Sequence, residues 1–277
     1  MFNNYLVGIK GGGDIATGLA FRLFRSGFPV FITELHQPLV VRRTVSFAEA
    51  IFSGETVVEG VKAIKTNSFT DVPIIIKKGN IPVLIDPDAL SFRDLKPVII
   101  VDAMMAKKNT GTTITDAEIV IGIGPGFRAG QDVHAIIETN RGHDTGRVIW
   151  EGSAEENTGM PSSISGCAEE RVLRAPCSGT IKTIKKIGER VETNEIVAHV
   201  GDRLVKAGIS GILRGIVHEG VKVTSGVKLG DIDPRGKREY CYTISDKALA
   251  VGGGVLEAIL TLMNGKKPAE VHGTPAG

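Results

Sequence analysis

The chain has 277 residues, a formal net charge of +2 and 35 glycines. Glycine is almost twice as frequent as in average proteins, but no Gly-X-Y period is present, which excludes a collagen-like chain. The near-neutral charge favours neither nucleic acid nor an acidic membrane as a partner. The chain contains no run of 18 apolar residues, so no membrane helix is expected.

Short apolar strands alternate with helical segments over the first 150 residues. The helix Asp14–Ser26 has apolar side chains around one broad face, and continuous apolar strands such as PVLID suit a parallel sheet that is covered on both faces. We therefore expect an α/β fold, with a Rossmann-like doubly wound parallel sheet over residues 1–165. The expected strands are Tyr5–Ile9, Val30–Thr33, Gly60–Ile64, Ile81–Ile85, Val98–Val101 and Glu118–Ile123.

An internal repeat follows a loop-like stretch that is rich in Gly, Ser, Asn and Thr. A shift of 32 residues aligns residues 175–200 with residues 207–232 without a gap, and both copies contain S-G-x-(apolar) and G-x-x-V. Two such copies can close into one small barrel. We therefore expect a duplicated all-β unit over residues 166–244, with chance similarity of two β segments as the alternative.

The last segment, residues 245–277, predicts a helix over Ser245–Asn264 and a tail. Ser245 is a candidate N-cap and Gly265 a candidate terminator. Gly252–Gly254 lie inside this helix and weaken it, so the pattern predicts either close packing or a break there.

A glycine turn carries the clearest binding motif. Gly11, Gly12, Gly13 and Ala16 match G-x-G-x-x-A between a strand and a helix, a geometry that brings a pyrophosphate to a helix N-terminus. Glu34 ends the next strand, where an acid commonly accepts a hydrogen bond from a ribose hydroxyl. These residues predict a dinucleotide such as NAD(P), or the molybdenum cofactor, as ligand; a domain that kept the turn and lost the ligand is the alternative.

Four charged residues are further candidates for this site. Arg42 and Arg43 could clamp a phosphate, or be solvated loop arginines. Asp86 and Asp102 end two strands and should face the same crevice, although Asp at such positions commonly caps the next element. No spacing in the chain predicts a metal site, and no catalytic residue is identified.

The cysteines and the N-terminal residues indicate the cellular compartment of the protein. The three cysteines, Cys167, Cys177 and Cys241, form no C-x-x-C pair, which argues against a disulfide framework, and the first residues lack a signal-peptide pattern. We expect a cytoplasmic protein.

Two resemblances to known families arise from these segments. The repeat resembles the barrel-sandwich hybrid of biotinyl and lipoyl domains, but the hairpin at residues 199–203 has no lysine, so attachment of biotin or lipoate is not expected. The segments IKGGGDIATGLAFRLFRSGFPVFITEL and QPLVVRRTVSFAEAIFSG resemble the YqeB family of selenium-dependent molybdenum hydroxylase accessory proteins, as do ETNRGHDTGRVIWEG and ISDKALAVGGGVLEAIL. That family's N-terminal half is similar to the Rossmann domain of XdhC-type proteins.

The second resemblance implies a maturation protein for molybdenum hydroxylases, with the client hydroxylase as partner. Two alternatives stay open: an NAD(P)-dependent oxidoreductase, and a non-catalytic scaffold with a degenerate Rossmann domain. Whether the chain is an enzyme and whether it forms a homo-oligomer are left open.

Overall fold

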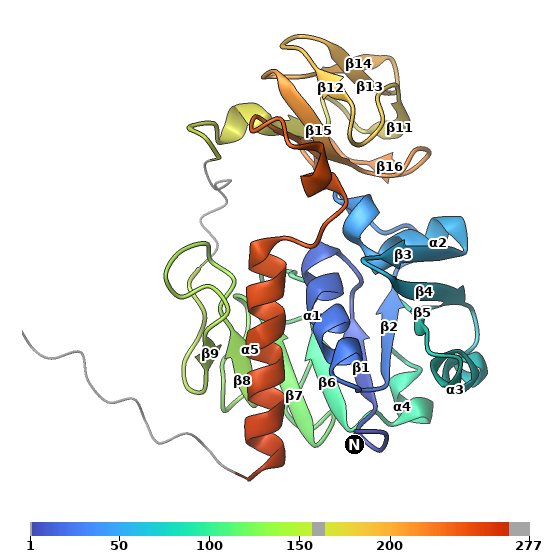
Figure 1. Ribbon diagram of the computed structural model, residues 1–277, viewed down its shortest axis with the longest axis vertical. Coiled ribbons are helices and arrows are strands. Elements are labelled where there is room, and N and C mark those ends of the chain that lie inside the picture. Colours follow the sequence, from blue (N-terminus) through green and yellow to red (C-terminus); the bar gives the residue numbers. More distant parts are fainter. Residues whose placement is uncertain (1, 157–163, 266–277) are drawn as a thin grey trace, which may run out of the picture.

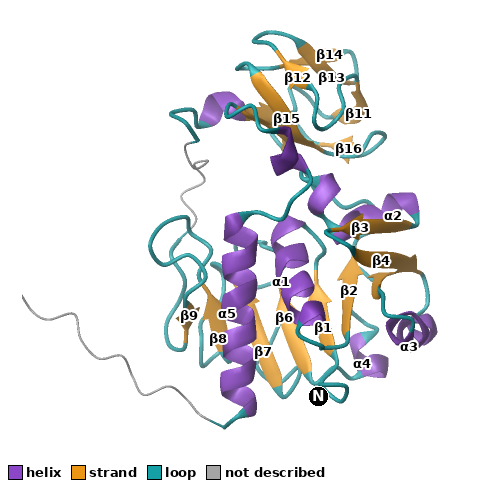
Figure 2. Ribbon diagram, in the orientation of Figure 1, coloured by secondary structure: helices purple, strands orange, loops and turns teal. Residues whose placement is uncertain are grey.

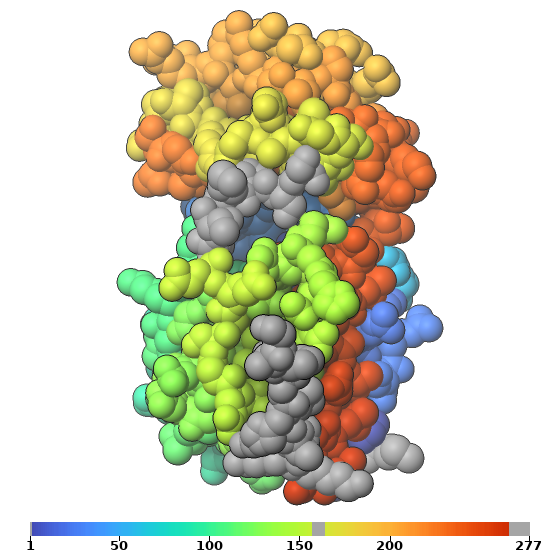
Figure 3. All heavy atoms as spheres, turned by 90° about the vertical axis from the view of Figure 1, so that its left-hand side faces the viewer, coloured from blue at the N-terminus to red at the C-terminus, as the bar shows by residue number. Residues whose placement is uncertain are grey.

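The protein consists of a larger unit of strands and helices and a smaller unit of strands, which lies above it along the long axis (Figures 1 and 3). The computed structural model describes residues 2–156 and 164–265. The smaller unit consists of strands, loops and short helical turns, while the long helices belong to the larger one (Figure 2).

The larger unit is built on a sheet of nine described strands in the order β3-β4-β5-β2-β1-β6-β7-β8-β9. Its inner strands run parallel, and the edge strands β3 and β9 are antiparallel to their neighbours. The strands are β1 (Val7–Lys10), β2 (Val30–Glu34), β3 (Glu55–Val58), β4 (Val61–Thr66), β5 (Ile81–Ile85), β6 (Ile99–Asp102), β7 (Ile119–Ile123), β8 (Ala135–Ile137) and β9 (Val148–Ile149). The six strands expected from the sequence are thus present, with ends shifted by at most two residues.

Two long helices cover one face of this sheet. Helix α1 (Asp14–Arg25) and helix α5 (Asp246–Met263) lie side by side there (Figure 1), and their apolar side chains share one core with the strands. The other α-helices of the described residues are α2 (Ala50–Ser53), α3 (Val72–Lys77) and α4 (Phe92–Leu95), which have four to six residues each.

The opposite face of the sheet is covered largely by loops. Alternate residues of a strand point to opposite faces, and Ile100 and Val120 pack there against Phe127, Val133 and Ala154 of the loops that follow β7 and β9. The expectation of a doubly wound parallel sheet is therefore wrong: the sheet is mixed, and long helices lie on one face. The segments between β6 and β8 contain Gly, Pro, Thr and Asn, which form turns rather than helices.

Helix α5 runs unbroken through its three central glycines. Gly252 and Gly254 are buried, and a Cβ at Gly252 would lie 2.9 Å from the carbonyl oxygen of Gly18 in α1. Close packing, rather than a break, is thus the reason for these glycines. The prediction of Ser245 as N-cap is confirmed, because its side chain accepts a hydrogen bond from the backbone N–H of Ala248.

The smaller unit consists of two four-stranded antiparallel sheets, in the orders β10-β17-β15-β12 and β14-β13-β11-β16. Strands β11, β12 and β13 lie 32 residues before β15, β16 and β17, so the two sequence copies fold alike. Each copy contributes one short strand to the sheet of the other. The strands are β10 (Val172–Arg174), β11 (Gly179–Thr183), β12 (Arg190–Val191), β13 (Ile196–Val200), β14 (Arg203–Lys206), β15 (Gly211–Ile216), β16 (Lys222–Val223) and β17 (Lys228–Asp233).

This unit has its own buried core, which includes Leu173, Val197, Leu213 and Ile232. The fold is thus a large mixed sheet with two antiparallel sheets, and this replaces the predicted combination of a Rossmann-like sheet and a barrel-sandwich hybrid. The predicted domain boundaries stay a prediction, and residues 266–277 of the predicted tail lie outside the described residues.

The segment after β2 joins the two units. Val41 packs against the core of the smaller unit. Arg42 donates hydrogen bonds to the carbonyl oxygens of Tyr240 (2.9 Å) and Thr243 (3.3 Å), and Arg43 donates to that of Ile216 (2.8 Å). The arginine pair therefore holds the smaller unit on the larger one.

Candidate functional site

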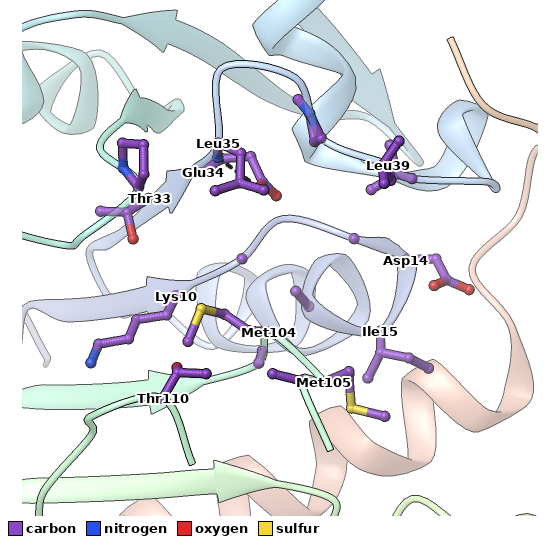
Figure 4. A pocket seen from close by; sticks show the side chains of 18 of the residues that line it. Lys10, Asp14, Ile15, Thr33, Glu34, Leu35, Leu39, Met104, Met105 and Thr110 are labelled. Carbon is purple, nitrogen blue, oxygen red and sulfur yellow. Dashed lines mark hydrogen bonds between the residues drawn. The ribbon is translucent and has the colours of Figure 1, made fainter. Parts of the chain in front are cut away.

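A cavity of about 820 Å³, here called the crevice, lies at the carboxyl ends of β1, β2, β5 and β6. Ligands of α/β proteins bind at this edge of the sheet, and the volume lies within the usual range of small-molecule sites. Figure 4 shows Leu35 and Leu39 on one side of the crevice, Met104 and Met105 on the other, and Lys10 and Asp14 toward its two ends.

The glycine turn forms the floor of the crevice. Gly11 has φ +89°, and a Cβ there would lie 3.3 Å from the carbonyl oxygen of Ala103. Gly13 and Ala16 also line the crevice. Gly12 does not: a Cβ at Gly12 would lie 3.0 Å from the backbone nitrogen of Ala48. Two of the three glycines therefore face the cavity, while the third permits close packing behind it.

Glu34 reaches back to this turn from the end of β2. One carboxylate oxygen accepts a hydrogen bond from the backbone N–H of Gly12 (2.8 Å), and the other accepts one from the N–H of Leu35 (2.8 Å). Burial raises the pKa of the Glu34 carboxyl above its ordinary value, although both hydrogen bonds oppose this. The N–H of Gly12, one of the residues predicted to bind a cofactor, thus already donates its hydrogen bond to Glu34.

The raised pKa of Glu34 predicts a pH-dependent stability difference for Glu34→Gln. The protonated acid favours the folded chain, so its contribution is fully present below the unfolded pKa of about 4.3 and is lost as the pH rises through the raised value. Relative to wild type, the free energy of unfolding of Glu34→Gln should therefore increase from pH 4 to pH 7. Urea titrations at several pH values measure this, with Glu257→Gln on the exposed side of α5 as control. A difference that stays flat or decreases with pH would contradict the prediction.

The other predicted charged residues divide into two groups. Arg42 and Asp86 line the crevice, and Asp86 also caps a turn by accepting the N–H groups of Leu90 and Ser91. Arg43 and Asp102 are not among the lining residues. Arg43 pairs with Glu49 (2.7 Å), and Asp102 accepts hydrogen bonds from Thr112 and Met104 and so fixes the loop after β6. Whether any of these residues binds a ligand stays a prediction.

Several lining residues were not expected from the sequence. Leu35, Leu39 and Met104 are 48%, 46% and 39% exposed, which is high for large apolar side chains that share one cavity. Lys228 and Asp231 reach the crevice from β17 of the smaller unit. The position of the two leucines directly after β2, at a ligand-binding edge, was a signal for the apolar part.

Another glycine-rich segment, Gly122–Gly126 at the end of β7, is explained by packing. A Cβ at Gly122 would meet the ring of Phe127, and one at Gly126 would meet the backbone of Lys108. Within residues 2–156 and 164–265, no group of three or more His, Cys, Asp or Glu side chains is arranged to hold a metal ion. Over the same residues, no helix combines the length and the apolar character that crossing a membrane requires.

Comparison with known proteins gives one curated relative and several partial structural matches. The chain is 47% identical over 259 residues to the "Uncharacterized protein YqeB" of Escherichia coli (strain K12), a match that covers 94% of this chain and 48% of that protein. The chain thus spans about half the length of the curated relative it matches. No family model matches the chain.

The similar solved structures include proteins named as succinylglutamate desuccinylase, as aspartoacylase family protein and as ectoine utilization protein. They include a succinylglutamate desuccinylase/aspartoacylase from Rhodobacter sphaeroides (22% identity, 31% of this chain and 30% of that chain, TM-score 0.21). An aspartoacylase family protein from Mesorhizobium loti matches with 12% identity over 84% of this chain and 85% of that chain, at a TM-score of 0.26. At such scores the likeness assigns this chain neither a fold nor a hydrolase activity.

These comparisons correct the function predicted from the sequence. The name of the curated relative contains no activity, and none of the solved structures named above is an XdhC-type protein. The predicted role as an accessory protein of selenium-dependent molybdenum hydroxylases is withdrawn, because no comparison supports it. The two alternative functions predicted from the sequence, an NAD(P)-dependent oxidoreductase and a non-catalytic scaffold with a degenerate Rossmann domain, are withdrawn as well.

Proposed function

We propose that this chain binds a small organic molecule in the crevice. The observation that carries the proposal is the composition of its walls: exposed Leu35, Leu39 and Met104 surround a floor made of the glycine turn and Glu34. Apolar walls with a few convergent polar groups are typical of small-molecule sites. A bound ligand would remove the three apolar side chains from water.

The polar groups narrow the class of ligand. The carboxylate of Glu34 is held in place by two backbone N–H groups and has further lone pairs that can accept hydrogen bonds. A hydroxyl-bearing group next to an apolar or planar group would fit this arrangement. A dinucleotide and the molybdenum cofactor, the two ligands expected from the sequence, both combine such groups with phosphate and are the first to test.

Filling the crevice from the glycine turn should abolish binding. The backbone of Gly13 (φ −64°, ψ −177°) accepts any side chain, and a Cβ there would meet Val40 only at 3.7 Å. In Gly13→Leu the rest of the side chain would therefore occupy the cavity without backbone strain. Gly253→Leu, at an exposed glycine of α5 with open space around it, is the matched control.

Two measurements test the proposal. Mass spectrometry of small molecules released from the purified wild-type protein searches for a co-purified ligand, and calorimetry measures binding of NAD, NADP, ATP and isolated molybdenum cofactor. We expect at least one ligand, bound at least tenfold more weakly by Gly13→Leu and unchanged by Gly253→Leu. No ligand in either measurement, or equal binding by both variants, would refute the proposed function.

A further inference from the structure

One end of the crevice, here called the junction end, is closed by the smaller unit. Lys228 and Asp231 of β17 line it together with Asp14 and Arg42 of the larger unit. Figure 4 shows Asp14 projecting toward one end of the crevice, away from Lys10. Arg42 is also the residue that bonds to the segment after β17, so the two units meet where the cavity ends.

Two buried side chains at the junction end have polar atoms without partners. Arg42 is 9% exposed, and its Nε has no hydrogen-bond partner within residues 2–156 and 164–265. Asp231 is 4% exposed; its Oδ2 accepts a hydrogen bond from Arg171 (3.0 Å), while its Oδ1 has no partner in the same described part of the chain. A buried polar atom without a partner is destabilising, so a hydrogen-bond acceptor from outside the chain is expected beside Arg42 and a donor beside Asp231.

The charges around Arg42 favour an anion as the acceptor beside this arginine. The carboxylate that pairs with Arg42 is that of Asp14, at 3.5 Å, and the Asp14 side chain is 35% exposed. Asp233 is already bonded to Arg235 (2.6 Å) and lies 3.7 Å from Arg214. Burial, and next the charge of Arg42, lower the pKa of Arg214, while the charges of Asp231 and Asp233 oppose this. The positive charge of Arg42 is thus only partly balanced.

We propose that the junction end binds an oxyanion group, a phosphate or a carboxylate, of the crevice ligand. Arg42 and Lys228 donate hydrogen bonds to the oxyanion from the two units, and Oδ1 of Asp231 accepts one from a neighbouring hydroxyl or amine of the same ligand. This inference rests on the proposed function and adds to it that the smaller unit is part of the binding site. The ligand is therefore anionic at one end and apolar along its middle.

Calorimetry of the full chain with inorganic pyrophosphate and with citrate tests the inference. Lys228 is exposed and forms no ion pair with the other described residues, so Lys228→Gln should fold with an unchanged Tm. Wild type should bind at least one of the two probes, with an affinity that falls as salt is added. We expect about tenfold weaker binding in Lys228→Gln and still weaker binding in Lys228→Glu. Lys222→Gln, at an exposed lysine of β16 outside the crevice, should bind as wild type does.

The two probes separate the sources of the oxyanion, because preference for pyrophosphate indicates a phosphate and preference for citrate a carboxylate. Binding of neither probe, or equal binding by Lys228→Gln and Lys222→Gln, would overturn the inference. If either of these outcomes occurs but an organic ligand is found in the crevice, the oxyanion site is refuted and the proposed function still holds. If a probe binds through Lys228 but no organic ligand is found, the oxyanion site is supported and only the proposed function is refuted.

Discussion

Alanine at Gly254 should lower the free energy of unfolding by about 3 kcal/mol, the upper part of the usual range for overpacking. A Cβ at Gly254 would collide with the carbonyl oxygen of Gly146 and lie 2.9 Å from Cγ2 of Ile137. Because the first of these atoms belongs to the backbone, a rotamer change cannot relieve the overlap. Helix α5 would have to move away from the sheet.

Gly253 is the matched control one residue earlier. It is exposed, and a Cβ there would have no neighbour within 4 Å, so Gly253→Ala should raise the free energy of unfolding by up to about 1 kcal/mol through helix propensity. Urea denaturation followed by circular dichroism measures both variants. Equal effects of the two substitutions would contradict the packing of α5 described here.

Removal of the Asp233 carboxylate should cost about 3–5 kcal/mol, the usual cost of removing one partner of a buried ion pair. Asp233 is 1% exposed, accepts hydrogen bonds from Arg235 and lies 3.7 Å from the largely buried guanidinium of Arg214. Asp233→Ala would leave Arg214 charged at the contact between the units. Asp202→Ala, in the exposed turn between β13 and β14, is the control and should change stability little.

The same carboxylate predicts a loss of stability in acid. Burial acts to raise the pKa of Asp233, but the hydrogen bonds and charge of Arg235 and the charge of Arg214 outweigh it and hold the pKa below its ordinary value. The stabilisation is therefore present above the unfolded pKa of about 3.9 and is lost as the pH falls toward the folded value. The difference between wild type and Asp233→Ala should shrink below about pH 4. A difference that is constant from pH 7 to pH 3 would contradict the assignment.

The strands were predictable where burial makes a sequence uniformly apolar. Ile81–Ile85 was located to the residue because both of its faces are covered. Strand β3 was missed because it is a short edge strand with Val57 exposed, and β8 and β9 have only three and two residues. The prediction of helices on both faces of the sheet was wrong. Apolar strands show that a face is buried but not whether a helix or a loop buries it.

The site was predictable as far as it depends on local geometry. Gly11, Gly13 and Glu34 line the crevice because a strand, a tight turn and a helix fix their positions relative to one another. The contacts of Arg43 could not be foreseen, since its acceptor, Ile216, lies 173 residues further along the chain. For the same reason Lys228 and Asp231 gave no sign that they would reach this cavity.

The pairing of α1 with α5 also determines when each core can be completed during synthesis. Helix α1 ends at Arg25 and its partner at Met263, so at 5–20 residues per second the apolar face of α1 lacks its cover for about 10–50 seconds. Among the described residues, the last one in the core of the smaller unit is Ile232. On the ribosome, the part of the chain made later can therefore finish folding first, and the larger unit stays open to chaperones until its last helix arrives.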